Sequence, residues 1–105
     1  MTENMKKNNF ESIKTYSEFY EDGTTKYKFS VIKINDEEIK NGECRKYYPN
    51  GKLAYEGLYS CGSKEGKWIY YYNTGKIKTI QYYKEGKLLK TENFNEKITT
   101  FSEND

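Results

Sequence analysis

The chain contains no histidine, only two cysteines among its 105 residues, and no long apolar run. Without histidine it lacks the commonest general base of enzymes and a common metal ligand. Its carboxylates stand singly or in polar stretches such as Asp36-Glu37-Glu38, and no nucleophile elbow, phosphate loop or metalloprotease helix is present. We therefore expect a protein that is not an enzyme and uses no cofactor.

The two cysteines, Cys44 and Cys61, fall short of the four ligands of a structural zinc site. If Asn50 and Gly51 form a two-residue hairpin loop, Cys44 lies opposite Gly57 and cannot reach Cys61. We therefore expect no metal site and no disulfide, with both thiols acting as small buried hydrophobes.

The chain also lacks a signal-like N-terminus, a membrane-spanning stretch and a polybasic cluster. Its 18 basic and 16 acidic residues leave a net charge of +2, too small for strong non-specific binding to nucleic acid. These absences predict a soluble, cytoplasmic protein that binds no membrane.

What the sequence does contain is a repeat. Three pairs of glycines are each 24 positions apart: Gly42 and Gly66, Gly51 and Gly75, Gly62 and Gly86. The residues between them match in kind: Tyr48 with Tyr72, Lys52 with Lys76, Leu53 with Ile77, Tyr59 with Tyr83. Such self-similarity is typical of an array whose units stack because none can bury its apolar surface alone.

The unit has the pattern of a β-hairpin. In Tyr47-Tyr48-Pro49-Asn50-Gly51-Lys52-Leu53, an Asn-Gly turn separates two β-prone runs. Applied along the chain, this pattern predicts strands at 12–21, 24–34, 43–49, 52–60, 66–73, 76–84 and 87–94. Residues 35–42 are then a polar connection in which the first unit carries about four extra residues, a place for specificity.

We therefore expect one domain, residues 12–94, between a flexible N-terminal segment, residues 1–11, and a polar C-terminal tail, residues 95–105. Strand alternation places Trp68, Tyr70 and Tyr72 on one face with Ile77. It places Ile69 and Tyr71 on the other, with Ile80 and Tyr82. A single-layer sheet cannot bury both faces, which leaves one for a partner, a second copy or a terminal cap.

Residues 42–53 and 65–77 resemble bacterial MORN-type repeats, in which a glycine and an aromatic pair precede an Asn-Gly-Lys or similar turn. The resemblance extends from about Gly42 to Phe94 and is to the variant often labelled antitoxin-like. It implies an all-β, elongated, twisted sheet of antiparallel hairpins that serves as a scaffold or interaction surface. No catalytic motif belongs to the repeat.

Together these observations predict a protein-binding repeat protein, most concretely a stoichiometric inhibitor of a toxin, nuclease or defence effector, encoded by a bacterium or a phage. The residues expected to bind the partner are those of the aromatic segments and their charged neighbour: Arg45, Tyr47, Tyr55, Tyr59, Trp68, Tyr70 and Tyr72. One alternative is a structural adaptor or self-assembling scaffold, a homo-oligomer. Another is a single-stranded nucleic-acid binder, with phosphate contacts from Lys46, Lys52, Lys76 and Lys84.

Overall fold

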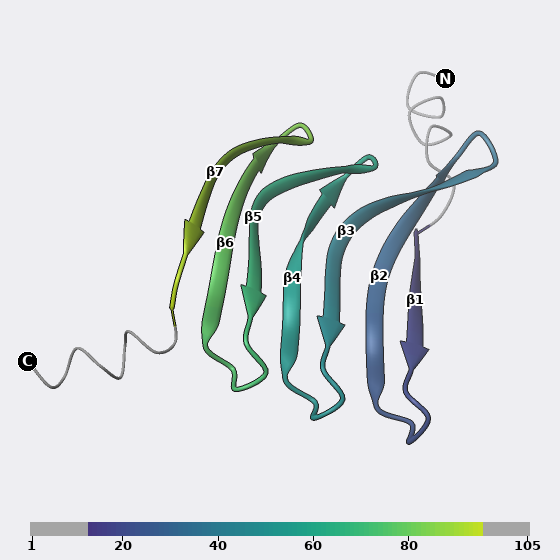
Figure 1. Cartoon of the computed structure of the whole chain (residues 1–105). Coiled ribbons are helices and arrows are strands. Elements are labelled where there is room, and N and C mark those ends of the chain that lie inside the picture. The colour runs from purple at the N-terminus through teal and green to yellow at the C-terminus, as the bar shows by residue number, and fades with distance from the viewer. Residues whose placement is uncertain (1–12, 96–105) are drawn as a thin grey trace, which may run out of the picture.

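A computed structural model describes residues 13–95, which form one open sheet of seven antiparallel strands in sequence order (Figure 1). The strands are β1 (Ile13–Phe19), β2 (Thr25–Ile34), β3 (Glu37–Tyr47), β4 (Leu53–Ser60), β5 (Ser63–Tyr71), β6 (Ile77–Lys84) and β7 (Lys87–Asn93). The predicted all-β array of hairpins is confirmed. The segment 1–11 and, apart from Asn95, the tail 95–105 lie outside the described residues.

At one end of the sheet the strands are joined by five-residue connections, residues 20–24, 48–52 and 72–76, in which the first and last residues close a three-residue loop. In the β3–β4 loop the Tyr48 amide donates to the Lys52 carbonyl at 2.8 Å, and the Gly51 amide donates to the Tyr48 carbonyl at 2.9 Å. Gly51 has a φ of 89°, the left-handed conformation that closes such a loop. The expected two-residue loop is therefore wrong by one residue, but a register shift after Lys46 absorbs the extra residue. Cys44 still pairs with Gly57, as predicted.

At the other end the strands are joined by two-residue turns: Asn35-Asp36, Cys61-Gly62 and Glu85-Gly86. Both residues of each turn have a positive φ, the type I′ geometry whose twist matches that of the flanking strands. Cys61 is consequently exposed in a turn, whereas Cys44 is buried, and both thiols are free. The expectation of a buried thiol thus holds for Cys44 and is wrong for Cys61.

The predicted polar connection at residues 35–42 is wrong, because residues 37–42 belong to β3. The four extra residues lengthen the β2–β3 hairpin, which extends beyond its neighbours in Figure 1. Polar residues can form this extension because both faces of a single-layer sheet meet solvent. Ile39 pairs with Ile32, while Glu38 pairs with Lys33.

The long strands bend where a glycine has no counterpart in the preceding strand. Gly42 and Gly66 have φ values of 101° and 74°, and each lies opposite a register shift in the preceding strand. Such bulges bend a strand and increase its twist. Figure 1 accordingly shows β3 and β5 curving toward the two-residue turns.

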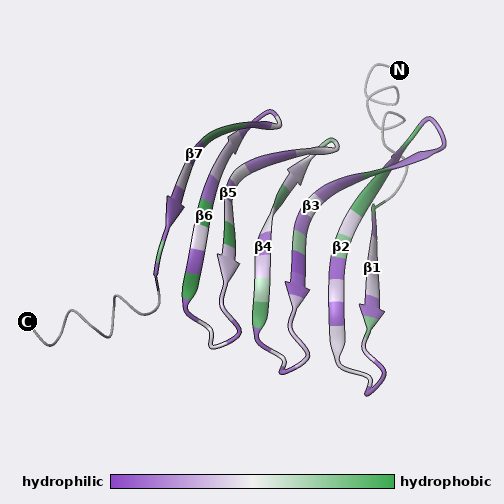
Figure 2. Cartoon of the chain, in the orientation of Figure 1, coloured by the Kyte–Doolittle hydropathy of each residue, from purple (hydrophilic) through white to green (hydrophobic). Residues whose placement is uncertain are grey.

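The core of the sheet is thin. Within residues 13–95 the buried apolar side chains are Val31, Ile32, Cys44, Trp68 and Ile80. Figure 2 shows apolar and polar positions interspersed along the strands, with no continuous apolar band. Trp68 lies over Gly57 so closely that a Cβ there would stand 2.2 Å from the indole ring. Its Nε1 donates to the Leu58 carbonyl at 3.0 Å, which satisfies the buried N–H.

The tyrosine that closes each three-residue loop, the first residue of the connection, links its hairpin to the next one. The Tyr48 hydroxyl donates to the Tyr71 carbonyl at 2.6 Å, and the Tyr72 hydroxyl donates to the Phe94 carbonyl at 2.9 Å. The Tyr20 hydroxyl donates in the same way to the carbonyl that ends β3. These repeated bonds hold neighbouring hairpins together outside the backbone ladder.

Candidate binding face

One face of the sheet is covered by aromatic rings from neighbouring strands. The pairs Tyr16–Phe29 and Tyr55–Tyr70 are directly opposed across strands, so the two members of each pair lie on the same face. Alternation and the ring contacts define what we call the aromatic face: Tyr16, Tyr27, Phe29, Tyr55, Tyr59, Trp68, Tyr70 and Tyr83.

The rings of this face touch one another in two groups. In the first, the Phe29 centroid is 5.4 Å from that of Tyr16 and 5.0 Å from that of Tyr27. In the second, Trp68 is 5.1 Å from Tyr59. Tyr55 is 6.1 Å from Trp68 and 5.5 Å from Tyr70. These tilted and edge-on contacts hold the rings in fixed positions.

Two lysines from equivalent repeat positions lie among the rings. The Nζ of Lys40 is 5.0 Å from the Phe29 centroid and 5.3 Å from that of Tyr59, which places it between the two groups. The Nζ of Lys64 is 4.7 Å from the Trp68 centroid. Neither lysine forms an ion pair with another residue of the described range 13–95. Each is a cation held against aromatic faces and open to an anionic group.

The surroundings of three phenols of the face favour their neutral form: Tyr27, Tyr55 and Tyr59. Burial, reinforced by the nearby Cys44 thiol, raises the pKa of Tyr55 and of Tyr59. Burial together with the Cys44 hydrogen bond raises that of Tyr27 in the same direction. Burial alone would lower the pKa of Lys64, but the Tyr70 hydroxyl beside it shifts the balance upward. At neutral pH the hydroxyls of Tyr27, Tyr55 and Tyr59 are therefore neutral, and the Lys64 amine is protonated.

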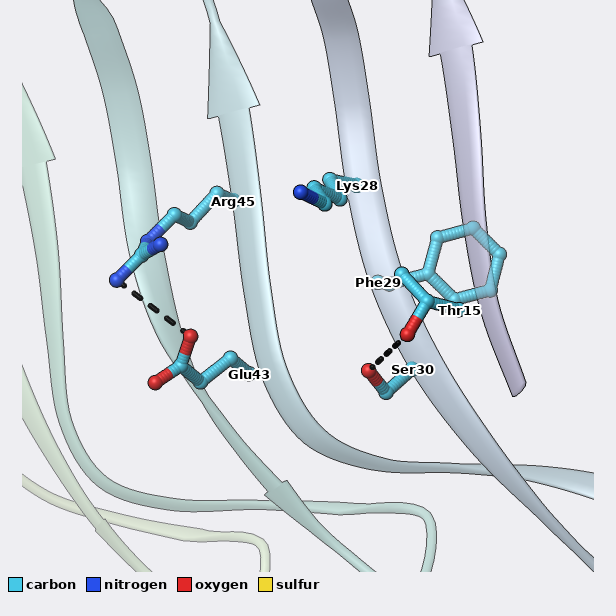
Figure 3. A pocket seen from close by; sticks show the side chains of 6 residues that line it. All are labelled: Thr15, Lys28, Phe29, Ser30, Glu43 and Arg45. Atoms are coloured by element: carbon cyan, nitrogen blue, oxygen red, sulfur yellow. Dashed lines mark hydrogen bonds and ion pairs between the residues drawn. The ribbon is translucent and has the colours of Figure 1, made fainter. Parts of the chain in front are cut away.

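The opposite face carries charged side chains that are paired with one another. Arg45 approaches Glu56 and Glu43, with nitrogen–oxygen distances of 3.5 Å to each. The Tyr71 hydroxyl donates to Glu56 at 2.7 Å. Burial and this carboxylate raise the pKa of Tyr71 to about 12. Figure 3 shows the shallow hollow beside Arg45, where Lys28 also lies.

The structure brings together four of the seven residues predicted to bind a partner. Tyr55, Tyr59, Trp68 and Tyr70 lie on the aromatic face. Trp68 is only 1% exposed, so it supports the tyrosines from beneath and offers no contact surface of its own.

The other three predicted residues lie elsewhere. Arg45 is on the opposite face. It pairs with Glu56, and each of the two is one position along its strand from the Cys44–Gly57 pair, in which Gly57 lies under Trp68. Successive side chains along a strand point to opposite faces. Tyr47 ends β3, and its carbonyl accepts the Tyr20 hydroxyl. Tyr72 lies in a loop and binds the Phe94 carbonyl. Their role in binding stays a prediction.

The predicted division of strand β5 is confirmed for most positions. Trp68 and Tyr70 share a face, while Ile69 pairs with Ile80 on the other. Ile77, however, pairs with Tyr71 and does not join Trp68. The cause is a register shift between Tyr70 and Tyr71, which simple alternation across the turn does not include.

Sequence reasoning missed four aromatic members of this face and both of its lysines: Tyr16, Tyr27, Phe29, Tyr83, Lys40 and Lys64. A signal for the lysines was present, because Lys40 and Lys64 are separated by the same 24 positions as the paired glycines. Tyr27 and Phe29 also alternate within a predicted strand. Their meeting with the later repeats depends on the bulge opposite Gly42, which is a structural observation.

Two segments, residues 40–60 and 64–85, match the family model described as the MORN repeat variant. Each spans most of one strand, a three-residue loop and the next strand. These two segments are therefore similar to MORN repeats, a family of generally non-catalytic motifs that bind proteins or membranes. Neither the curated proteins nor the solved structures gave a match.

Two further observations concern residues 13–95 alone. They contain no group of three or more histidine, cysteine, aspartate or glutamate side chains that could hold a metal ion. They also contain no helix of the length and hydropathy needed to cross a membrane.

Proposed function

We propose that the chain is a non-catalytic repeat protein that binds another protein through its aromatic face. One observation carries the proposal: eight aromatic residues from neighbouring strands share one face of a sheet that, over residues 13–95, is a single layer. A cluster of aromatic side chains that no second layer covers is typical of an interaction site.

The chemistry of the face suits a protein partner. Tyrosine contributes a large contact area at a low cost in side-chain entropy, and it is enriched among the residues that dominate binding energy. The rings are already fixed by their neighbours, as in the Tyr55–Tyr70 contact at 5.5 Å. Binding therefore requires little further ordering of these side chains.

The finer form of the proposal is a stoichiometric inhibitor that acts in the cytoplasm of a bacterium, whether host- or phage-encoded. Its partner would be a toxin, a nuclease or a defence effector, whose active site it covers. The resemblance to antitoxin-like repeats and the scarcity of catalytic groups support this form. Tyr47 and Tyr72 would contact the partner at the loop end of the sheet, whereas Arg45 would contact it where the partner extends to the opposite face.

The test is capture of partners by the tagged full chain from nuclease-treated native lysate at moderate salt, followed by an activity assay of the protein captured. We expect one dominant protein, in a one-to-one complex, whose activity falls as the chain is added. A Tyr59→Ala/Tyr70→Ala variant should lose the complex, whereas a matched Lys28→Ala/Lys67→Ala variant of the opposite face should keep it. Retention by the first variant and loss by the second would refute the assignment of the face.

A single-stranded nucleic acid is the second candidate, favoured by the positions of Lys40 and Lys64 against aromatic rings. Bases can stack on such rings while lysines neutralise phosphates. This alternative predicts that binding weakens steeply with added salt and that the bound material is lost when the lysate is treated with nuclease. Substitution of Lys46, Lys52, Lys76 or Lys84 should then give additive losses.

A further inference from the structure

Strand β1 leaves one edge of the sheet open. Within the described residues it pairs only with β2, so the outward amide and carbonyl groups of Ile13–Phe19 have no ladder partner. Ile13 is 67% exposed and Phe19 is 59% exposed, although both are large apolar residues. An open edge with exposed apolar side chains is a surface that another strand can join.

The sequence of β1 is complementary to itself when a second copy runs antiparallel to it about Tyr16. Lys14 then lies opposite Glu18, Thr15 opposite Ser17, and Ile13 opposite Phe19. Directly opposed side chains point to the same face, so each cation meets an anion and each exposed apolar residue meets another.

The surroundings of these charges leave them available for this pairing. Glu18 forms no ion pair with another residue of the range 13–95, and Lys14, although it forms an ion pair with Glu38 at 3.8 Å, keeps its side chain 59% exposed and can approach a second carboxylate. Alternation puts Lys14 and Glu18 on the face of Tyr16, whose ring packs on Phe29. The central pair would be two copies of Tyr16, which would extend the aromatic face across the junction.

Strand β7, the other edge, does not have this complementarity. Antiparallel pairing of two copies of β7 about its central residue, Lys90, places Lys90 opposite Lys90 and Leu88 opposite Glu92. Lysines on an edge strand are a common means of preventing edge-to-edge association. A head-to-tail array is also disfavoured, because β1 and β7 run in the same direction and would have to pair in parallel.

We propose that two copies of this chain form a two-fold symmetric dimer by antiparallel pairing of β1 with β1. The two seven-stranded sheets then become one continuous sheet, and both aromatic faces lie on the same side. A dimer of this form presents two identical binding faces to its partners. It does not depend on what those faces bind.

The test is the mass of the full chain in solution, measured by sedimentation equilibrium over a concentration series. We expect a species of twice the 12.5 kDa chain mass. Glu18→Lys turns both symmetry-related attractions into repulsions and should raise the dimer dissociation constant roughly tenfold or more. The exchanged variant Lys14→Glu/Glu18→Lys restores opposite charges and should restore the dimer.

Lys87→Glu, on the opposite edge, is the matched control and should leave the mass unchanged. Thermal unfolding of each variant verifies that the sheet is intact. A wild-type chain that stays monomeric throughout the series would overturn the proposal. So would a dimer that resists Glu18→Lys, or one that Lys87→Glu dissociates. Glu18→Lys leaves the tyrosines of the aromatic face in place. Binding of the partner protein by this variant therefore tests the proposed function separately from dimer formation.

Discussion

At the scale of single residues, the contact between Trp68 and Gly57 fixes the centre of the sheet. The indole ring covers the glycine and is almost fully buried, in a molecule with few other buried side chains. Among the glycines of residues 13–95, Gly57 alone does not have a positive φ. Its role is therefore to leave space for the indole ring. A methyl group at this position cannot be accommodated unless Trp68 moves.

The first prediction is therefore that Gly57→Ala lowers the free energy of unfolding by about 1–3 kcal/mol, the usual cost of overpacking. The emission of Trp68, the single tryptophan of the chain, should shift to longer wavelength as the ring becomes exposed. Urea unfolding followed by this fluorescence measures both effects. In a Trp68→Leu background, read by circular dichroism, the same substitution should cost less. An equal cost in both backgrounds would exclude the ring contact as the cause.

The second prediction concerns Tyr71 and alkaline pH. Its pKa rises from 10.0 to about 12 in the folded state, through burial and the hydrogen bond to Glu56. Its stabilising contribution is thus complete below pH 10 and is lost as the pH rises from 10 through 12. Tyr71→Phe should make the stability fall less steeply over this interval, as measured by denaturant unfolding at several pH values. Glu56→Gln should act in the same direction, and an unchanged slope in both variants would contradict the account.

At the scale of elements, two kinds of turn alternate along the array, and the sequence predicts them to different extents. The three-residue loops follow from a tyrosine and a glycine three positions later, as in Tyr48 and Gly51. The strand order and the Cys44–Gly57 pair could be predicted because local turn chemistry and alternation agree. The start of β3 at Glu37 could not be predicted in this way. A polar stretch indicates a loop only in a sheet whose strands must bury one face, and the strands of a single-layer sheet need not do so.

The bulges set the other limit on prediction. Alternation alone separates Trp68 and Tyr70 from Ile69, and the structure agrees. It cannot place Phe29 relative to the later repeats, because Gly42 adopts a positive φ within a strand and shifts the register. A glycine in a strand can mark either a bulge or a close contact, and the sequence does not distinguish Gly42 from Gly57.

The third prediction tests the β2–β3 turn. Asp36 has a φ of 69° where the equivalent turns have Gly62 and Gly86. Glycine adopts this conformation without a steric cost, so Asp36→Gly should raise the free energy of unfolding by roughly 0.5–1 kcal/mol. The matched variant Asp36→Ala should lower it. Thermal unfolding of the two variants gives the comparison, and stabilisation by alanine would show that backbone strain is not the cause.

The fourth prediction tests the bonds between hairpins. Tyr48→Phe removes the hydroxyl that binds the Tyr71 carbonyl and should cost about 1 kcal/mol. Tyr47→Phe is the control, because the Tyr47 hydroxyl bonds to no residue of the range 13–95, and its effect should stay within about 0.5 kcal/mol. Equal losses in urea unfolding would mean that the Tyr48 bond contributes nothing specific.

At the scale of the whole molecule, a single layer has consequences that a globular domain does not share. Most contacts of each strand are with its neighbours in the sheet, so stability is largely a sum of local terms, as in other repeat proteins. Both faces remain available over residues 13–95, one aromatic with two lysines and one with internally paired charges. The first has rings and cations to offer a partner, whereas Arg45, Glu43 and Glu56 of the second are paired with one another.

The most direct test of this account is side-chain footprinting of the chain, by hydroxyl radicals and mass spectrometry, alone and in complex with its captured partner. We predict that Tyr55, Tyr59 and Tyr70 become protected in the complex, while Tyr71 and Tyr82, which lie on the opposite face, keep their reactivity. Protection of Tyr71 and Tyr82 with no change at Tyr55, Tyr59 and Tyr70 would contradict the claim that the aromatic face is the binding surface.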